Sequence, residues 1–367
     1  MTATAPLRIG FAGANAERGW ACDAHFPALH ALPGLAVHAV SARTPEIAAL
    51  AAETFGAAKA YADSLEMARD PDIDIVAVTV KVPEHRAIVL AALEAGKHVY
   101  CEWPLARDTA EAEELAEAAR KAGTHVAIGL QGANSIAARH ASRLVHDGAI
   151  GRPLRLRILS PTAGWGTDAP PHYAYLQDRR NGATLATIAG GHTLALVAAV
   201  IGSFVEVGAC NTILQSQVQI AGTGEMVERT CADHIMIHGR HPGGCVSNIE
   251  IVSGDTSPFS FELFGSAGKI EITGHHPGGY QCAALTATGP TRNDPQPASE
   301  LPGLEGAAIN VAELYRRFEQ DIRSGSRTVA DFDMAVKLHR LLDAIEVSSD
   351  EGRSVTPYDS DMGSWDA

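Results

Sequence analysis

The first part of the chain alternates short apolar runs with helical stretches, and this alternation restricts the fold more than any other feature. Five runs have the character of β-strands: Leu7–Ala12, Leu35–Val40, Ile73–Val80, His98–Cys101 and His125–Ile128. Helices are predicted between them at Pro83–Ala95 and Thr109–Lys121, the second with Thr109 as its N-cap and Gly123 just past its end. Strands that alternate with helices usually form a parallel sheet covered on both faces. We therefore predict a doubly wound α/β domain over residues 1–132.

The pattern changes near Gly148–Pro153, where apolar and polar residues begin to alternate. The alternation is clearest in Leu154–Ser160, Cys231–His238 and Phe261–Gly265, and two His-Pro-Gly-Gly turns start at His241 and His276. Alternating runs between turns indicate antiparallel strands. Helical patterns occupy Thr184–Ile201, Val311–Ser324 and Phe332–Val347. We predict an α+β domain with a large, mostly antiparallel open sheet over residues 133–355, followed by a tail of residues 356–367.

Composition excludes several classes of function. Lys and Arg number 29 against 43 Asp and Glu, so the net charge of −14 disfavours nucleic-acid binding. No apolar run approaches the roughly twenty residues that a membrane-spanning helix needs. The start of the chain lacks the pattern of a secretory signal, and the 6 cysteines form no Cys-x-x-Cys pair. We therefore expect reduced thiols and a cytoplasmic location, without a membrane or nucleic-acid partner.

The first predicted strand ends in a glycine-containing turn, Gly10-Phe-Ala-Gly13-Ala14-Asn15. In dinucleotide-binding domains the first glycine allows a tight turn, and the second lets a pyrophosphate approach the backbone. The third glycine of that fingerprint is missing at its usual place, since Gly19 comes later. An ordinary glycine turn is the alternative. The position directly after the first strand favours the nucleotide site of a Rossmann domain, so Gly10, Gly13, Ala14 and Asn15 are predicted cofactor contacts.

The end of the second strand bears on cofactor choice. NAD-selective sites usually place an acidic residue there, whereas this chain has Ser41, Arg43 and Thr44. A hydroxyl and a guanidinium suit the 2′-phosphate of NADP. The alternative is that Arg43 is a solvated loop residue. We predict NADP as the cofactor, with NAD as the alternative.

Three segments carry a resemblance to a known family. They are Ala95–Pro104 (AGKHVYCEWP), Gly182–Gly202 with His192, and Phe261–Gly268 (FELFGSAG). Together they resemble motifs of the glucose–fructose oxidoreductase / inositol dehydrogenase (Gfo/Idh/MocA) family. The resemblance implies a Rossmann domain, a second domain built on an antiparallel sheet, and sugar or polyol substrates bound between the two. Glu102 resembles the motif glutamate that contacts the cofactor ribose. We also predict cofactor contacts from Lys81, Pro83, His85, Trp103 and Gln131.

The departures from the family motifs matter as much as the matches. Trp103 stands where the family has a lysine, and Ile188 and Ala195 stand where acidic residues are common, so His192 is the member of the proton-handling set that remains. We predict His192 as the proton-handling residue, because the ordinary pKa of histidine lies near ~6.5. Lys81 is the second catalytic candidate.

Each of these candidates also has an alternative role that involves no catalysis. Lys81 could position the cofactor without any proton chemistry, and Trp103 could stack on the nicotinamide or fill the vacated lysine site. A lone histidine on an apolar helix is usually a core residue with its hydrogen bonds satisfied.

A narrower resemblance leaves the activity open. The segments Gly10–Trp20 and Val80–Pro83, and the pair Glu102-Trp103, resemble the branch of the family that holds the fungal galactose-regulon repressor and its bacterial relatives. The predicted function is an NAD(P)-dependent oxidoreductase acting on a sugar-like or other hydroxylated or carbonyl compound. The alternative is a catalytically silent, dinucleotide-binding regulatory protein.

The histidines of the later part invite a metal hypothesis that we reject. His234, Met236 and His238 alternate along one face of a predicted strand, and His241 follows in the turn. The spacing lacks the cysteine or acidic residue that would complete a ligand set, so no metal is predicted. We interpret this face as half solvated or facing another subunit. The latter predicts a homodimer or a dimer of dimers.

Overall fold

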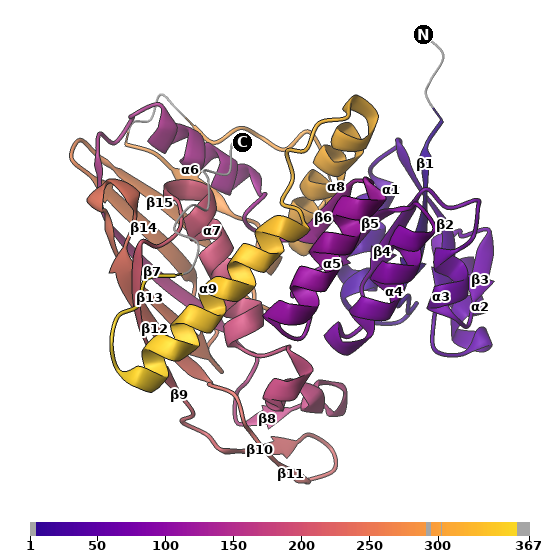
Figure 1. Cartoon of the computed structure of the whole chain (residues 1–367), viewed down its shortest axis with the longest axis horizontal. Coiled ribbons are helices and arrows are strands. Elements are labelled where there is room, and N and C mark those ends of the chain that lie inside the picture. Colours follow the sequence, from indigo (N-terminus) through magenta and orange to yellow (C-terminus); the bar gives the residue numbers. More distant parts are fainter. Residues whose placement is uncertain (1–4, 291–294, 302, 358–367) are drawn as a thin grey trace. The chain divides into compact units, whose positions relative to one another are not determined.

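The computed structural model describes residues 5–290, 295–301 and 303–357, and the chain divides into two compact units (Figure 1). The first unit consists of Met1–Gln131 and Glu300–Val336, and the second of Gly132–Ser299 and Lys337–Ala367. This division differs from the predicted boundary, which left residues 300–336 with the second domain. The chain returns to the first unit because helix α8 (Ala307–Ser324) packs on the helices that follow the first strand. Most of the predicted tail, from residue 358 on, lies outside the described residues.

The first unit is built on a parallel sheet of six strands in the order β3-β2-β1-β4-β5-β6. The strands are β1 (Leu7–Ala12), β2 (Leu35–Ser41), β3 (Lys59–Tyr61), β4 (Ile75–Val78), β5 (His98–Glu102) and β6 (Val126–Gly129). Its helical elements are η1 (Ala21–His25), α1 (Phe26–His30), α2 (Pro45–Phe55), α3 (Ser64–Ala68), α4 (Val82–Glu94), α5 (Thr109–Ala122) and α8. All four residues of β4 are buried, as expected for a strand covered on both faces. The predicted Rossmann-type sheet is confirmed.

Local capping sets the helix ends in this unit. The side chain of Asp108 accepts a hydrogen bond from the backbone N–H of Glu111, so the N-cap of α5 is Asp108. The prediction of Thr109 was wrong by one residue, because a carboxylate one position earlier is an equally good cap. Gly123 adopts the left-handed conformation at the other end, as predicted. At the sheet edge, the carbonyl of Ala330 accepts from the N–H of Ile128 in β6.

The second unit contains a sheet of seven strands in the order β16-β15-β14-β7-β13-β12-β9. They are β7 (Pro153–Thr162), β9 (Glu206–Thr212), β12 (His234–Arg240), β13 (Val246–Ser253), β14 (Phe259–Gly265), β15 (Lys269–Gly274) and β16 (Thr286–Thr288). The β7–β13 pair is parallel and the other pairs are antiparallel. The predicted α+β domain with a mostly antiparallel sheet is confirmed.

One face of this sheet is covered by helices and the other is open. On β12 the side chains of Ile235 and Ile237 are buried, whereas Met236 is 46% exposed. The covered face packs against helix α7 (Gly191–Ile201), where the hydroxyls of Ser160 and Thr193 lie 2.9 Å apart. Helix α6 (Ile136–His146) packs on α7, and α9 (Phe332–Glu351) ends the described helices.

A smaller sheet in the same unit joins β8 (Asp168–Ala169), β10 (Gln217–Ile220) and β11 (Met226–Glu228). Next to it the fully buried guanidinium of Arg229 pairs with Asp233 at 2.6 Å and donates to Gln177 and to the carbonyl of Gly166. This set of bonds holds the surrounding loops together. Among the helices of the described ranges, none is long and apolar enough to cross a membrane.

Candidate functional site

The turn after β1 lies close to the segment that follows β4, and this close approach requires a glycine. Gly13 has a φ of +94°, and a Cβ added there would lie 2.9 Å from a methyl carbon of Val80. The N–H groups of Gly13 and Ala14 donate to the carbonyl of Ser41 at 3.1 and 3.0 Å, which ties this turn to the end of β2. Only a residue without a side chain fits this combination of φ and space.

In dinucleotide-binding domains a helix usually begins directly after this turn, but here it begins later. The side chain of Asn15 accepts from the backbone N–H groups of Glu17 and Arg18, and helical structure begins only at Ala21, with the π-helical turn η1. Gly19 has a φ of +101° within this longer connection. The displaced helix start accounts for the missing third glycine, since no helix lies against the strand at its usual position.

The end of β2 presents the three predicted residues differently. Ser41 is buried, and its hydroxyl lies 2.8 Å from that of Ser64, at the start of α3. Thr44 is the N-cap of α2, with its hydroxyl accepting from the N–H of Ile47. Arg43 is exposed. Of the three, only the Arg43 side chain is displayed to solvent without a role in local capping or packing.

The end of β4 combines an exposed lysine with a buried histidine. Lys81 is the exposed N-cap residue of α4, and Pro83 lies in the first turn of that helix. His85 is 1% exposed, and its ring nitrogens lie 3.2 and 3.0 Å from the carbonyl oxygens of Leu105 and Val80. Burial lowers its pKa. His85 therefore joins the loops after β4 and β5 and acts on the site through their shape.

The end of β5 contains Glu102 and the cis peptide Trp103–Pro104. Trp103 is only 5% exposed, which agrees with an aromatic ring packed in the vacated lysine site. Oε1 of Glu102 lies 3.1 Å from Nε2 of His25, the last residue of η1. Two residues beyond β6, Gln131 is 1% exposed, and its side-chain oxygen has no hydrogen-bond partner in the described parts of the chain.

His192 lies in the second unit, near the start of α7. A π-helical turn, η4 (Ala186–Gly190), precedes it, and the hydroxyl of Tyr280 donates to its backbone carbonyl. The side chain is 3% exposed, and Nδ1 has no hydrogen-bond partner among the residues that the structure describes. Burial lowers the pKa of His192 to about 3. The expectation of an ordinary pKa was wrong, because it ignored the desolvation of the ring.

The carboxyl ends of β1, β2, β4, β5 and β6 lie along one edge of the parallel sheet, so the structure brings the predicted residues of the first unit to that edge. Sequence reasoning missed His25 and Tyr315, whose side chains contact each other and, through His25, Glu102. His25 follows an unremarkable apolar pattern, and Tyr315 is distant in sequence. No local signal pairs them.

The histidines considered for metal binding do not converge. Met236 and His238 are exposed on the open face of the sheet, whereas His241 is buried and bonds to the carbonyl of Gly202 and the hydroxyl of Ser247. Elsewhere in the described chain, His38, Asp70 and Asp72 have potential ligand atoms within 4.8 Å of one another. The ammonium of Lys59 already bonds both carboxylates, at 2.7 and 2.8 Å. That pairing gives a sufficient explanation for the acidic group.

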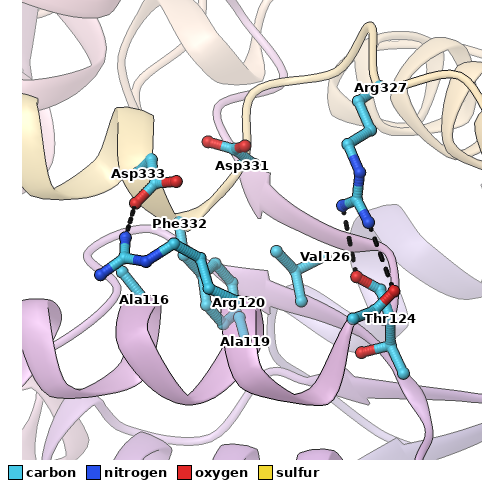
Figure 2. A pocket seen from close by; sticks show the side chains of 10 residues that line it. Ala116, Ala119, Arg120, Thr124, Val126, Arg327, Asp331, Phe332 and Asp333 are labelled. Carbon is cyan, nitrogen blue, oxygen red and sulfur yellow. Dashed lines mark hydrogen bonds and ion pairs between the residues drawn. The ribbon is translucent and has the colours of Figure 1, made fainter.

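A pocket of the first unit lies at the C-terminal end of α5 (Figure 2). It is lined by Ala116, Ala119, Arg120, Gly123, Thr124, Val126, Arg327, Asp331, Phe332 and Asp333. Arg327 donates to the carbonyls of Gly123 and Thr124, and Arg120 pairs with Asp333 (Figure 2). Both guanidinium groups thus have protein partners, and none of the predicted site residues lines this pocket.

Comparison with known proteins follows the same division of the chain. Residues 7–130 match the oxidoreductase family with an NAD-binding Rossmann fold, and residues 137–274 match the Gal80p C-terminal domain. The dehydrogenase aclE of Aspergillus oryzae is 28% identical over 335 residues, which covers 86% of this chain and 88% of the relative. The galactose/lactose metabolism regulatory protein GAL80 of Saccharomyces cerevisiae is 28% identical over 254 residues, covering 64% of this chain and 58% of the regulator.

Solved structures show the same fold over nearly the whole chain. A super-repressor mutant of Gal80p from Saccharomyces cerevisiae superposes with a TM-score of 0.85 at 23% identity, covering 98% of this chain and 100% of the other. Levoglucosan dehydrogenase in complex with NADH and levoglucosan has a TM-score of 0.81 at 21% identity, covering 96% and 100%. With both family matches in chain order and this fold throughout, the protein belongs to the Gfo/Idh/MocA oxidoreductase family and carries a Gal80p-like C-terminal domain.

Proposed function

We propose that this protein is an NAD(P)-dependent oxidoreductase that transfers hydride to or from a sugar-like or other hydroxylated or carbonyl small molecule. The observation that carries the proposal is His192, which is buried with Nδ1 unpaired among the described residues. An unpaired buried polar atom costs free energy that a hydrogen bond from a ligand would recover.

The carboxyl edge of the parallel sheet fits a dinucleotide. Gly13 lets the turn lie against Val80, and in such a glycine turn a pyrophosphate would approach the backbone, with Gly10, Ala14 and Asn15 completing the turn. Lys81, Glu102 and Gln131 would border the nicotinamide end, with Pro83, His85 and Trp103 shaping the loops that hold them. The bound cofactor supplies or accepts the hydride.

NADP is the proposed cofactor, with NAD as the alternative. The Ser41 hydroxyl is already engaged by Ser64, and Thr44 caps α2, so the preference depends on the exposed Arg43. A guanidinium binds a phosphate more strongly than a ribose hydroxyl because the hydrogen bonds are charge-assisted.

The proton is assigned to His192, with Lys81 supplying positive charge. Because burial lowers the pKa of His192 to about 3, its ring is neutral near pH 7. A neutral imidazole can accept the proton that an alcohol loses when it is oxidised. A ring with so low a pKa is a weak base at pH 7, so this role requires that the bound cofactor and substrate raise the pKa of His192 toward neutrality.

A second function has specific support. Trp103 fills the place of the family lysine, and the relative GAL80 is described as a metabolism regulatory protein. On this reading the dinucleotide site is retained, the chemistry is lost, and the partner is a transcription regulator.

The test separates binding from chemistry. NADH and NADPH are titrated separately, and sugars, polyols, and aromatic alcohols or ketones are then screened for an absorbance change at saturating cofactor. Hydride transfer to or from any of them supports the enzyme. Lys81→Ala should then lower turnover and cofactor affinity together. If a compound binds at saturating cofactor and no hydride is transferred in a single turnover, the regulatory function replaces the enzymatic one.

We also propose a cytoplasmic homodimer or dimer of dimers. The face of the large sheet that carries Met236 and His238 is exposed in the single chain, and such faces are often covered by a second subunit. Sedimentation velocity should give at least a dimer at micromolar concentration. A stable monomer there would rule the assembly out.

A further inference from the structure

Beneath the edge of the parallel sheet lies a buried chain of polar side chains that the proposed chemistry does not use. Nδ1 of His25 lies 2.9 Å from the hydroxyl of Tyr315, and Nε2 lies 3.1 Å from Oε1 of Glu102. His25 and Tyr315 are fully buried, and the Glu102 side chain is 12% exposed. The chain thus runs from the interior toward the residue predicted to contact the cofactor.

Aromatic rings fix the plane of the His25 imidazole. Phe11, Trp20, Tyr100 and Tyr315 all meet it edge to face, with ring centroids 5.2, 6.1, 5.5 and 5.6 Å away. Tyr315 also stacks on Tyr100 at 4.4 Å. A ring held by four aromatic neighbours cannot turn to find other partners, so its two nitrogens remain directed at Tyr315 and Glu102.

The proton arrangement follows from what each group can donate. An ionised carboxylate only accepts, so Nε2 must carry the hydrogen that faces Glu102. In a neutral ring Nδ1 then accepts, and the Tyr315 hydroxyl donates to it. Burial raises the pKa of the Tyr315 hydroxyl, which keeps its proton in place. The donors therefore point in one direction, from Tyr315 through His25 to Glu102.

The contact at Glu102 is close but incompletely satisfied. Oε1 of Glu102 and Nε2 of His25 are both buried and lie 3.1 Å apart without forming a hydrogen bond. On the other side, a Cβ added to Gly129 would lie 2.6 Å from Oε1, so the carboxylate rests against the backbone of β6. A small movement of Glu102 would complete the bond to His25.

We propose that His25 and Tyr315 are positioning residues that hold Glu102 in the orientation in which it binds the nicotinamide-side ribose of the cofactor. This inference rests on the proposed function, since it needs a dinucleotide at this edge. The chain ends at the fully buried Tyr315, so it orients the carboxylate and has no route to carry a proton to solvent. It is specific to the nicotinamide end and does not read the 2′-phosphate.

The decisive variant is Tyr315→Phe, which removes one oxygen and keeps the ring. It should weaken the binding of NADH and NADPH equally, by about threefold to tenfold, the range expected for one lost hydrogen bond. The matched control is Tyr61→Phe in the same unit, whose hydroxyl bonds Asp70 and has no contact with Glu102. Dissociation constants are measured by titration, with a thermal melt to confirm that each variant is folded.

A double-mutant cycle tests whether the effect passes through Glu102. In a Glu102→Gln background, Tyr315→Phe should change the dissociation constants by less than about twofold, because coupled residues are not additive. His25→Gln, which keeps an N–H donor toward Glu102, should retain more affinity than His25→Leu.

The outcomes separate the two proposals. If the parent binds cofactor and Tyr315→Phe behaves like Tyr61→Phe, or its effect is unchanged in the Glu102→Gln background, the positioning role is wrong and the cofactor site stands. If the parent binds neither NADH nor NADPH, both proposals are wrong.

Discussion

Two regions of the molecule differ in the polar neighbours that they give to buried histidine rings. At the edge of the parallel sheet, His85 and His25 each have a polar neighbour at both ring nitrogens. At the start of α7, Nδ1 of His192 has none within the described residues. The contacts of His85 join two loops of the framework and those of His25 lie within the interior, whereas a buried ring nitrogen with no polar neighbour is a candidate for a hydrogen bond to a ligand. This difference agrees with the proposal that the first region holds the cofactor and the second contacts the substrate.

The largest test of this contrast is His192→Ala. Removing a positioned acid or base typically lowers the rate by about a hundredfold to ten-thousandfold, and we expect that loss in single-turnover hydride transfer. The affinities for NADH and NADPH should stay nearly unchanged, because the residue belongs to the other unit. His241→Ala is the matched control. That ring is buried with partners at both nitrogens, so its loss should lower stability and spare the turnover of folded protein. Parental rates in His192→Ala would contradict the proton assignment.

Arg43→Asp examines the other region. It should weaken NADPH binding by roughly tenfold to a hundredfold, the range for a lost charge-assisted hydrogen bond, and affect NADH much less. Arg69→Asp, at another exposed arginine of the first unit, should change neither. Equal losses for the two cofactors, or a parental preference for NADH, would show that Arg43 does not read the 2′-phosphate.

The pH dependence of the free energy of unfolding tests the desolvation of His192 and needs no substrate. The pKa of His192 is about 3 in the folded chain and near 6.5 when unfolded, so the unfolded state binds the extra proton between these values. Stability from the neutral ring is therefore present above pH 6.5 and is lost as the pH falls toward 3. Between pH 7 and pH 5 the loss should be about 2 kcal/mol. Denaturant unfolding of the parent and of His192→Asn at both pH values measures it; equal losses in the two proteins would show that the ring is not desolvated.

The smallest expected effect concerns the glycine turn. Gly13 has a positive φ, and a Cβ added there would lie 2.9 Å from Val80. Gly19 also has a positive φ, but a Cβ added there would have no atom within 4 Å. Gly13→Ala and Gly19→Ala should each lose about 1 kcal/mol of stability through φ, and Gly13→Ala should lose roughly 1 kcal/mol more through overpacking. Only Gly13→Ala should also reduce cofactor binding. Identical behaviour of the two variants would argue against a close approach at Gly13.

Periodicity and turn residues predicted most of the fold from the sequence. Apolar runs identified β1, β2, β4, β5 and β6 to within about two residues, because strand composition and burial are local properties. The prediction of a strand over Cys231–His238 was displaced from the observed His234–Arg240, and the carboxylate of Asp233, just before the strand, accepts from the N–H of Leu214 in the connection after β9. Boundaries depend on such side-chain bonds, which a pattern of hydrophobicity does not contain.

The site was harder to predict than the fold, for reasons that are physical. The motif located His192, but its desolvation depends on neighbours such as Tyr280 from a distant segment. Ser41 was predicted to face the cofactor, and only the fold reveals Ser64 beside it. The pairing of His25 with Tyr315 joins residues 290 positions apart, so no local pattern could indicate it.

The return of residues 300–336 to the first unit limits how the protein can be dissected. A fragment ending at Gln131 would lack Ala330, which pairs with β6, and would expose the edge of a parallel sheet to other chains. It would also lack Tyr315 and leave the His25 ring with an open side. The first unit is therefore not one continuous stretch of chain. During synthesis its six strands are made first, but the packing of α8 and the bond from Ile128 to Ala330 can form only after most of the chain has left the ribosome.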